Sequence, residues 1–172
     1  MSAITVDRFD LQLLKELQLD GQATNQGLGD KIHLSASQVS RRILRLQEAG
    51  VIDRYCALID PSAIGLDVMA FTEVSLVHHH AAAGGQFEQE IARLPQVLEC
   101  YTLAGSADYL LRIVAADLRA LSDFMTRHIL SIQGVANVKS TITLRRIKQT
   151  NVLPLDHVLQ PPESKRKIQF TS

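Results

Sequence analysis

The order of hydrophobic patterns between residues 68 and 144 constrains the fold more than any other feature of this chain. Four segments are rich in apolar and β-branched residues, as strands are: 68–77, 97–103, 109–115 and 135–144. Two segments carry apolar residues at helical spacing: 86–94 and 117–129. The resulting order, βαββαβ, predicts a ferredoxin-like split βαβ domain with an antiparallel sheet and both helices on one face. Because no further segment is left to cover the other face, we expect at least a homodimer.

The first fifty residues follow a different pattern, with three helical segments in succession. Apolar residues at helical spacing follow Asp7 and end near Gly21, and Thr24 can cap a short second helix. A turn of about three or four residues at His33 and Leu34 then leads into a third helix, which is the helix-turn-helix plan. The strand-like segment 51–59 fits a small wing. The predicted fold class is therefore α+β, with a winged helix-turn-helix domain ahead of the ferredoxin-like domain.

The third helical segment, residues 34–50, has the pattern of a capped helix with a basic outer face. Ser35 and Gln38 have the spacing of a capping box, and Gly50 supplies a stop. One stripe carries the apolar residues Val39, Ile43 and Leu46, while Ser37, Gln38, Arg41 and Arg45 point the other way. No acidic residue lies between Ser35 and Gln47, so we expect the guanidinium groups to have no local carboxylate partner. The segment predicts a DNA-reading helix; an ordinary solvated helix is the alternative.

The composition sets limits on the class of protein. The 172 residues have 18 basic and 18 acidic side chains, so a DNA-binding protein of this kind must concentrate its positive charge locally. No apolar run approaches the roughly 18 residues that cross a bilayer, and the start has no leader pattern, so we expect a cytoplasmic protein with no membrane partner. Cys56 and Cys100 match no metal or redox spacing and are expected to be reduced thiols. We predict neither a metal nor a cofactor.

The expected domain boundaries follow from these patterns. We place the winged helix-turn-helix domain at 1–54, a β-strand linker at 55–66 and the ferredoxin-like domain at 67–148. The last segment, 149–172, contains three prolines and the run Lys165-Arg166-Lys167, with few apolar residues. It predicts an extended basic tail that is solvated rather than bound to phosphates.

Taken together, the chain resembles the Lrp/AsnC family of transcriptional regulators over roughly residues 5–155. The resemblance rests on short motifs in a fixed order: Asp7-Arg8-Phe9-Asp10, Leu34-Ser35, Arg42 with Arg45-Leu46, Gly50-Val51-Ile52, Glu99-Cys100-Tyr101, Gly105 to Leu111 and Gly134-Val135. It implies a sequence-specific DNA-binding regulator that assembles as dimers, often four in a ring. It also implies a small effector, typically an amino acid, bound between dimers near the turn at Gly105.

The candidate site residues combine the helix pattern with this resemblance. For double-stranded DNA they are Ser35, Ser37, Gln38, Ser40, Arg41, Arg42 and Arg45, with Arg42 and Arg45 nearest the phosphates. For the effector they are Leu103, Gly105, Ser106, Ala107, Asp108, Tyr109 and Ser140. Ser106 stands where many relatives have an aspartate, which removes one carboxylate that could meet an ammonium group. From the residues alone, Gly105 and Asp108 are better explained as parts of a simple hairpin turn; the resemblance favours the ligand site instead.

Other functions need to be weighed against a regulator. The sirohaem decarboxylases look like the same fold used for tetrapyrrole chemistry, in which His78 or His128 would serve, but the arginine-bearing helix argues against an enzyme. A nonspecific DNA-organising protein would differ only in its specificity ratio. The run His78-His79-His80 is expected to be a solvated strand end rather than a metal site, since neighbouring residues on a strand alternate sides.

Overall fold

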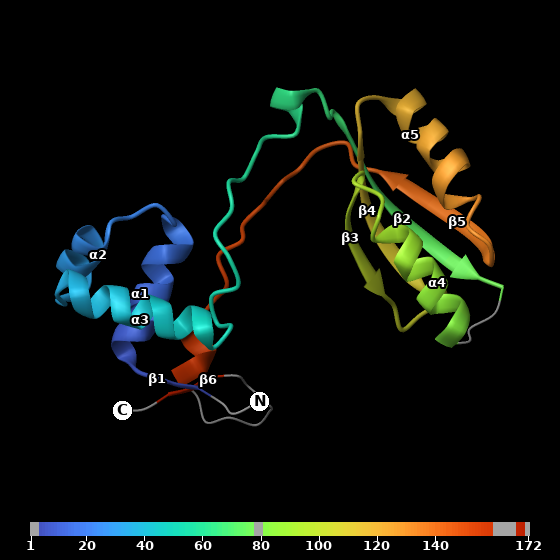
Figure 1. Ribbon diagram of the computed structural model, residues 1–172. Coiled ribbons are helices and arrows are strands. Elements are labelled where there is room, and N and C mark those ends of the chain that lie inside the picture. The colour runs from blue at the N-terminus through green and yellow to red at the C-terminus, as the bar shows by residue number, and fades with distance from the viewer. Residues whose placement is uncertain (1–3, 78–80, 160–167, 171–172) are drawn as a thin grey trace. The chain divides into compact units, whose positions relative to one another are not determined.

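The computed structural model describes residues 4–77, 81–159 and 168–170, without the side chains of 4, 81–84, 159 and 168–170. Internal contacts divide the chain into two units (Figure 1). Residues 1–57 and 148–172 form one, called here the helical unit, and residues 58–147 form the other, called the sheet unit. The run His78-His79-His80 lies outside the described residues. No helix of the described part is both long and apolar enough to cross a membrane.

Three helices build the helical unit in the order that the sequence predicts. They are α1 (Arg8–Leu19), α2 (Asn25–Ile32) and α3 (Ala36–Glu48). Asp7 caps α1 and Thr24 caps α2, while Ser35 and Gln38 form the predicted capping box of α3. The three helices share one apolar core, to which α3 contributes fully buried Val39 and Leu46. The core fixes which side of α3 faces inward and which side faces solvent.

The turn between α2 and α3 is unusually close. Gly29, near the end of α2, is buried, and a Cβ added there would lie 2.3 Å from the carbonyl oxygen of Leu34. His33 ends α2 in the left-handed region, with φ 60° and ψ 45°, which favours glycine. From helix propensity alone, Gly29 is a cost to the helix. The structure shows why a glycine stands here despite this cost: the chain after α2 passes directly over the residue and leaves no room for a Cβ.

The C-terminal segment corrects one expectation. Instead of a separate extended tail, the described residues 149–159 and 168–170 belong to the helical unit. The run Lys165-Arg166-Lys167, expected to be solvated, lies outside the described residues. A short 3-10 helix, η3 (Asp156–Leu159), buries Val158 in the helical core, and β6 (Ile168–Phe170) pairs in parallel with β1 (Ile4–Val6). Leu153 also exchanges two hydrogen bonds with the side chain of Gln18. Of the apolar residues of this segment, Val158 lies in the helical core and Leu155 packs against it.

The linker corrects a second expectation. Residues 51–67 contain no strand; the only regular element among them is a 3-10 turn, η1 (Ser62–Ile64). The wing strand expected over 51–59 is therefore absent as well. The residue types are strand-like, but a strand also requires a neighbouring strand to pair with, and the described residues provide none here. Tyr55 instead lies beside Gly21, in the turn after α1: a Cβ added at Gly21 would lie 3.2 Å from the ring.

The sheet unit has the predicted ferredoxin-like arrangement. Its elements are β2 (Val68–Leu76), α4 (Ala81–Ile91), β3 (Val97–Thr102), β4 (Tyr109–Ala115), α5 (Leu118–Phe124) and β5 (Val135–Ile142). The strands are antiparallel neighbours in the order β3-β4-β2-β5. The helix α4 begins five residues earlier than predicted, because its alanine- and glycine-rich start has no apolar period to read. The fold class is therefore α+β, as predicted.

The two faces of the sheet differ sharply. Alternate residues of β2, such as Thr72 and Val74, are fully buried beneath α4 and α5, which contribute Phe87 and Phe124 to the same core (Figure 1). Phe71, the residue before Thr72 in β2, lies on the opposite face and is 39% exposed. No described element of the sheet unit covers that opposite face, here called the open face.

Candidate nucleic-acid interface and ligand-binding turn

The outer face of α3 presents the polar residues that the sequence predicted. Ser35, Ser37, Gln38, Ser40, Arg41 and Arg45 are all exposed. Two of them are occupied in part by the cap: the Gln38 side-chain oxygen accepts hydrogen bonds from the backbone nitrogen and the hydroxyl of Ser35, both at 2.9 Å. Gln38 therefore offers its amide nitrogen, rather than its oxygen, to a partner. Leu44 is 55% exposed on the same helix.

The arginines of α3 fall into two classes. Arg41 is exposed and has no acidic partner among the residues that the structure describes. Arg42, by contrast, is only 24% exposed and donates hydrogen bonds from Nη1 to Asp10 at 2.7 Å and to Asp7 at 3.0 Å. Arg45 also donates to Asp10, while 47% of its side chain stays exposed. The expectation that these guanidinium groups have no carboxylate partner is therefore wrong for Arg42 and Arg45.

The acidic partners come from the start of α1, where Asp10 is fully buried. Besides the two arginines, its carboxylate accepts a hydrogen bond from the backbone nitrogen of Asp7 at 3.0 Å. Burial would raise the pKa of Asp7, but hydrogen bonds from the backbone of Asp10 and from Arg42 outweigh it, so this pKa is lowered. Both aspartates belong to a motif on which the family resemblance rests, but the sequence indicated no role for either of them. The pairing joins residues more than thirty positions apart, which local patterns do not reveal.

In the sheet unit, the predicted ligand-binding residues gather at the turn between β3 and β4. Leu103, Gly105 and Ser106 are exposed, whereas Ala107 is buried. Asp108 is built into the sheet: its carboxylate accepts a hydrogen bond from the backbone nitrogen of Leu76 at 2.8 Å, and its own nitrogen donates to Val74. The turn is closed by Leu103, whose nitrogen donates to the carbonyl oxygen of Asp108 at 2.8 Å.

Two further predicted residues lie at different places near this turn. Tyr109, the first residue of β4, is buried, and its hydroxyl donates to Glu88 on α4 at 3.0 Å. Burial, together with this bond, raises the pKa of Tyr109 to about 12, so the hydroxyl is a donor at neutral pH. Ser140 lies on β5 opposite Thr72, and their hydroxyls are 3.0 Å apart. Since β5 pairs with β2, and β2 pairs with β4, β2 separates Ser140 from the strand that leaves the turn.

Gly105 is not required by the conformation of this turn. Its backbone does not adopt the left-handed region, and a Cβ added there would meet nothing within 4 Å. The glycine therefore leaves open space in front of the turn. From the residues alone a simple hairpin is the favoured explanation of Gly105, and the resemblance favours a ligand site; the geometry shows that the backbone of the turn does not need a glycine at this position.

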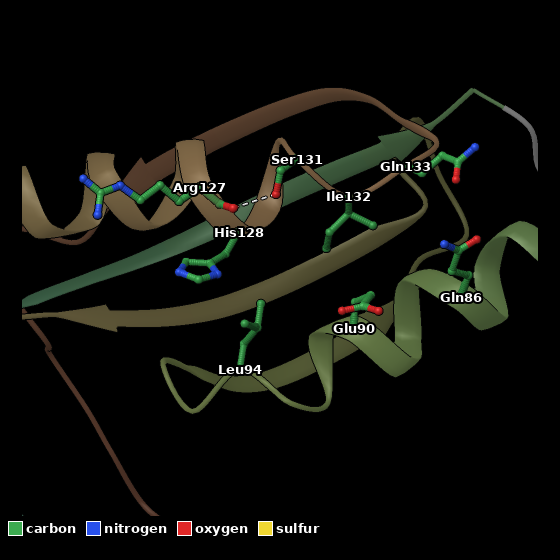
Figure 2. A pocket seen from close by; sticks show the side chains of 8 residues that line it. All are labelled: Gln86, Glu90, Leu94, Arg127, His128, Ser131, Ile132 and Gln133. Carbon is green, nitrogen blue, oxygen red and sulfur yellow. Dashed lines mark hydrogen bonds between the residues drawn. The ribbon is translucent and has the colours of Figure 1, made fainter.

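A pocket that the sequence did not indicate lies beneath α4. It has a volume of about 310 Å³ and is lined by Gln86, Glu90, Leu94, Arg127, His128, Ser131, Ile132 and Gln133. Arg127 and His128 belong to a single π turn, Met125–Ile129, that continues α5, and the residues Ser131 to Gln133 follow this turn. Figure 2 shows the side chains of His128, Ile132 and Leu94 converging, while the guanidinium of Arg127 points away from them. The His128 ring packs against Phe124, with ring centres 5.3 Å apart.

Comparison with known protein families agrees with this two-part organisation. Residues 6–53 match the model of a winged helix-turn-helix DNA-binding domain. Residues 69–153 match the model of the Lrp/AsnC ligand-binding domain. The first match spans the helices α1, α2 and α3, and the second spans most of the sheet unit.

Comparison with individual proteins gives matches along nearly the whole chain. The leucine-responsive regulatory protein of Rhizobium meliloti is 37% identical over 84% of this chain and 93% of its own. The Bkd operon transcriptional regulator of Pseudomonas aeruginosa is 35% identical over 87% of this chain and 98% of its own. Among solved structures, a Neisseria meningitidis transcriptional regulator in complex with L-Met is 36% identical, with a TM-score of 0.85, covering 89% of this chain and 99% of its own.

Proposed function

Because the chain belongs to the Lrp/AsnC family, we propose that it recognises a specific DNA sequence through α3 and responds to an amino acid held by the sheet unit. It is a transcriptional regulator with a helix-turn-helix domain and a ligand-binding domain, and its relatives and domains are not those of an enzyme. The sirohaem decarboxylase alternative is thereby set aside. The observation that carries the DNA-binding proposal is the exposed polar face of α3 on a helix whose other side is fixed in the core.

On this proposal, α3 lies in the major groove with Ser37, Gln38 and Arg41 near the base edges. Arg41 suits guanine, because its fork donates two parallel hydrogen bonds to O6 and N7. Gln38, with its oxygen held by the cap, would donate to an acceptor on a base edge. Ser35, Ser40 and the exposed part of Arg45 would contact the neighbouring phosphates. Leu44 would contact a thymine methyl group or the neighbouring subunit.

The DNA-binding proposal is tested by selecting bound duplexes from a random-sequence library with the full chain. We expect a short enriched sequence that binds about a thousandfold or more tightly than unrelated DNA at physiological salt. Arg41→Ala should cost about 1–3 kcal/mol at one base position and relax the preference there. If no sequence is enriched although unrelated DNA binds, the chain is the nonspecific DNA-organising protein that was considered as the alternative.

The effector proposal rests on the turn between β3 and β4. Its exposed residues, Leu103, Gly105 and Ser106, offer backbone donors and acceptors that suit the carboxylate and ammonium groups of an amino acid. The open space at Gly105 gives such a ligand room. The Asp108 carboxylate is engaged by the backbone of β2, so we assign the ammonium group to backbone carbonyls. The Neisseria meningitidis regulator in complex with L-Met supports an amino acid as the ligand class.

The effector proposal is tested by calorimetric titration of the full chain with each amino acid, methionine included, together with a measurement of oligomer size. We expect binding by at least one of them, with a change in DNA affinity or in assembly. The absence of heat for every amino acid, with no change in size, would exclude the proposal. The pocket beneath α4 is a separate location: Glu90→Gln should leave the binding unchanged if the ligand sits at the turn.

We also propose that the open face of the sheet pairs with a second copy of the chain. It exposes Phe71 and Tyr101, at 39% and 52%, around an ion pair between Arg112 and Glu99 at 2.5 Å. Exposed aromatic side chains on a sheet face favour a cover, and a two-fold partner would supply the same surface. Analytical ultracentrifugation should give a dimer or a multiple of it, up to a tetramer of dimers. Phe71→Glu should shift the species toward monomer, and a monomeric parent protein would contradict the proposal.

A further inference from the structure

Asp10 occupies an unexpected place for an acid in a DNA-binding domain. It is fully buried in α1, yet its carboxylate is the meeting point of two arginines from the proposed recognition helix. Asp7 adds a second carboxylate to Arg42, with 2.9 Å between Nη1 and Oδ2. The four side chains therefore form a cluster with no net charge. We call Asp7, Asp10, Arg42 and Arg45 the acid–arginine cluster.

The cluster divides the positive charge of α3 into a free part and a neutralised part. A carboxylate presents two oxygens to a guanidinium much as a phosphate does, so a guanidinium that is already bound to Asp10 gains less from a DNA phosphate. Arg42 is largely enclosed, whereas Arg45 is half exposed and within reach of a partner from outside. Arg41 has no such competitor among the described residues.

We propose that Asp10 is a specificity-determining residue of the DNA-binding domain. By holding Arg45 and Arg42, it lowers the sequence-independent attraction of α3 for phosphates, so that base contacts decide where the protein binds. Sequence-independent affinity for DNA depends on how many phosphates the protein neutralises. A basic side chain contributes fully only if it is not already paired with an acidic one. The inference rests on the proposed DNA-binding function, and it adds that an acid which contacts no DNA sets the ratio of specific to nonspecific binding.

The test compares Asp10→Asn with Asp156→Asn in the full chain. Both variants remove one carboxylate from the helical unit, but Asp156 is 83% exposed and, among the described residues, forms its ion pair with Lys15, on a different part of α1. The readout is the salt dependence of binding to a labelled duplex of arbitrary sequence. We expect Asp10→Asn to steepen the slope of log affinity against log salt by about one unit and to raise low-salt affinity several-fold. Its preference for the selected sequence should fall, while Asp156→Asn should stay close to the parent.

A second comparison leaves the buried carboxylate untouched, in case Asp10→Asn fails to fold. On the duplex of arbitrary sequence, where Arg41 has no selected guanine to bind and its charge is free for a phosphate, Arg41→Gln should lower the salt slope by about 0.9 unit, the value for one phosphate contact, whereas Arg45→Gln should lower it by much less. Where Asp10→Asn folds, adding Arg45→Gln to it should remove the increase of about one unit in the salt slope. Equal losses for Arg41→Gln and Arg45→Gln in the parent, or matching slopes for Asp10→Asn and Asp156→Asn, would overturn the inference. A parent protein that binds no duplex would instead overturn the proposed function.

Discussion

Two tight turns, each with a glycine in it or beside it, differ in the space around that glycine. At the turn between α2 and α3, the chain itself fills the space beside Gly29, where an added Cβ would lie 2.3 Å from the Leu34 oxygen. At the turn between β3 and β4, the space beside Gly105 is empty out to 4 Å, and the backbone conformation does not need a glycine. The first glycine is explained by packing inside one chain. The second is explained by something outside the chain, in our proposal an effector.

The comparison also separates what each unit does with its polar groups. In the helical unit, the aspartates fix the orientation of a helix whose outer face stays exposed. In the sheet unit, the Asp108 carboxylate holds the turn in place by accepting a hydrogen bond from the backbone of β2. The exposed backbone of the turn is not needed for this contact. In both units an acid supports the site without forming its surface. Substitutions at four positions test this division, from the largest expected change in stability to the smallest.

Gly29→Ala should destabilise the protein the most. The new Cβ would overlap a backbone carbonyl oxygen that belongs to the turn itself, and overpacking of this kind costs about 1–3 kcal/mol. Alanine recovers about 1 kcal/mol of helix propensity, and because the overlap is with backbone rather than with a flexible side chain, we expect a net loss of about 2 kcal/mol. Urea denaturation followed by circular dichroism measures it. An unchanged midpoint would show that the turn can move away, and the contrast between the two glycines would lose its basis.

Asp108→Ala should come next, with a loss of about 1.5 kcal/mol. The substitution leaves the backbone nitrogen of Leu76 without the carboxylate that now accepts from it at 2.8 Å, and a charge-assisted bond of this kind contributes about 1.5–3 kcal/mol. Ser106→Ala, at an exposed position of the same turn, is the matched control and should change stability little. Equal denaturation midpoints for the two variants would mean that Asp108 does not support the turn.

His33→Gly should raise stability, by about 1 kcal/mol. His33 is the one described residue other than glycine with a positive φ, and the left-handed conformation costs a residue with a Cβ about 1–2 kcal/mol. Glycine also gains freedom in the unfolded chain, which offsets part of the benefit. Thermal unfolding should show a higher midpoint for His33→Gly, whereas His33→Ala should not. A midpoint that falls for His33→Gly would show that the histidine side chain makes a stabilising contact.

The sequence predicted the parts of this fold that depend on local patterns. The capping box at Ser35 and the bounds of β4 are as predicted, because both follow from residues close together in the chain. It did not predict the pairing of Asp10 with Arg42 and Arg45, the docking of Val158 in the helical core or the π turn at Met125–Ile129. The first two join distant segments, and the third depends on how α5 packs. Exposure at α3 was predictable; the neutralisation of two of its arginines was not.

Gly105→Ala should change stability least and ligand response most. Because the added Cβ meets nothing within 4 Å and φ is ordinary, we expect the free energy of unfolding to stay within about 0.5 kcal/mol of the parent. The methyl group nevertheless occupies the space that we assign to the effector, so calorimetry should show weaker amino-acid binding, and a bulkier Gly105→Val should weaken it further. The matched control is Gly85→Ala on α4, where an added Cβ also meets nothing within 4 Å. If both Gly105 variants bind the amino acid as the parent does, the open space at Gly105 serves another purpose, and the ligand must be sought elsewhere, first in the pocket at His128 and Glu90.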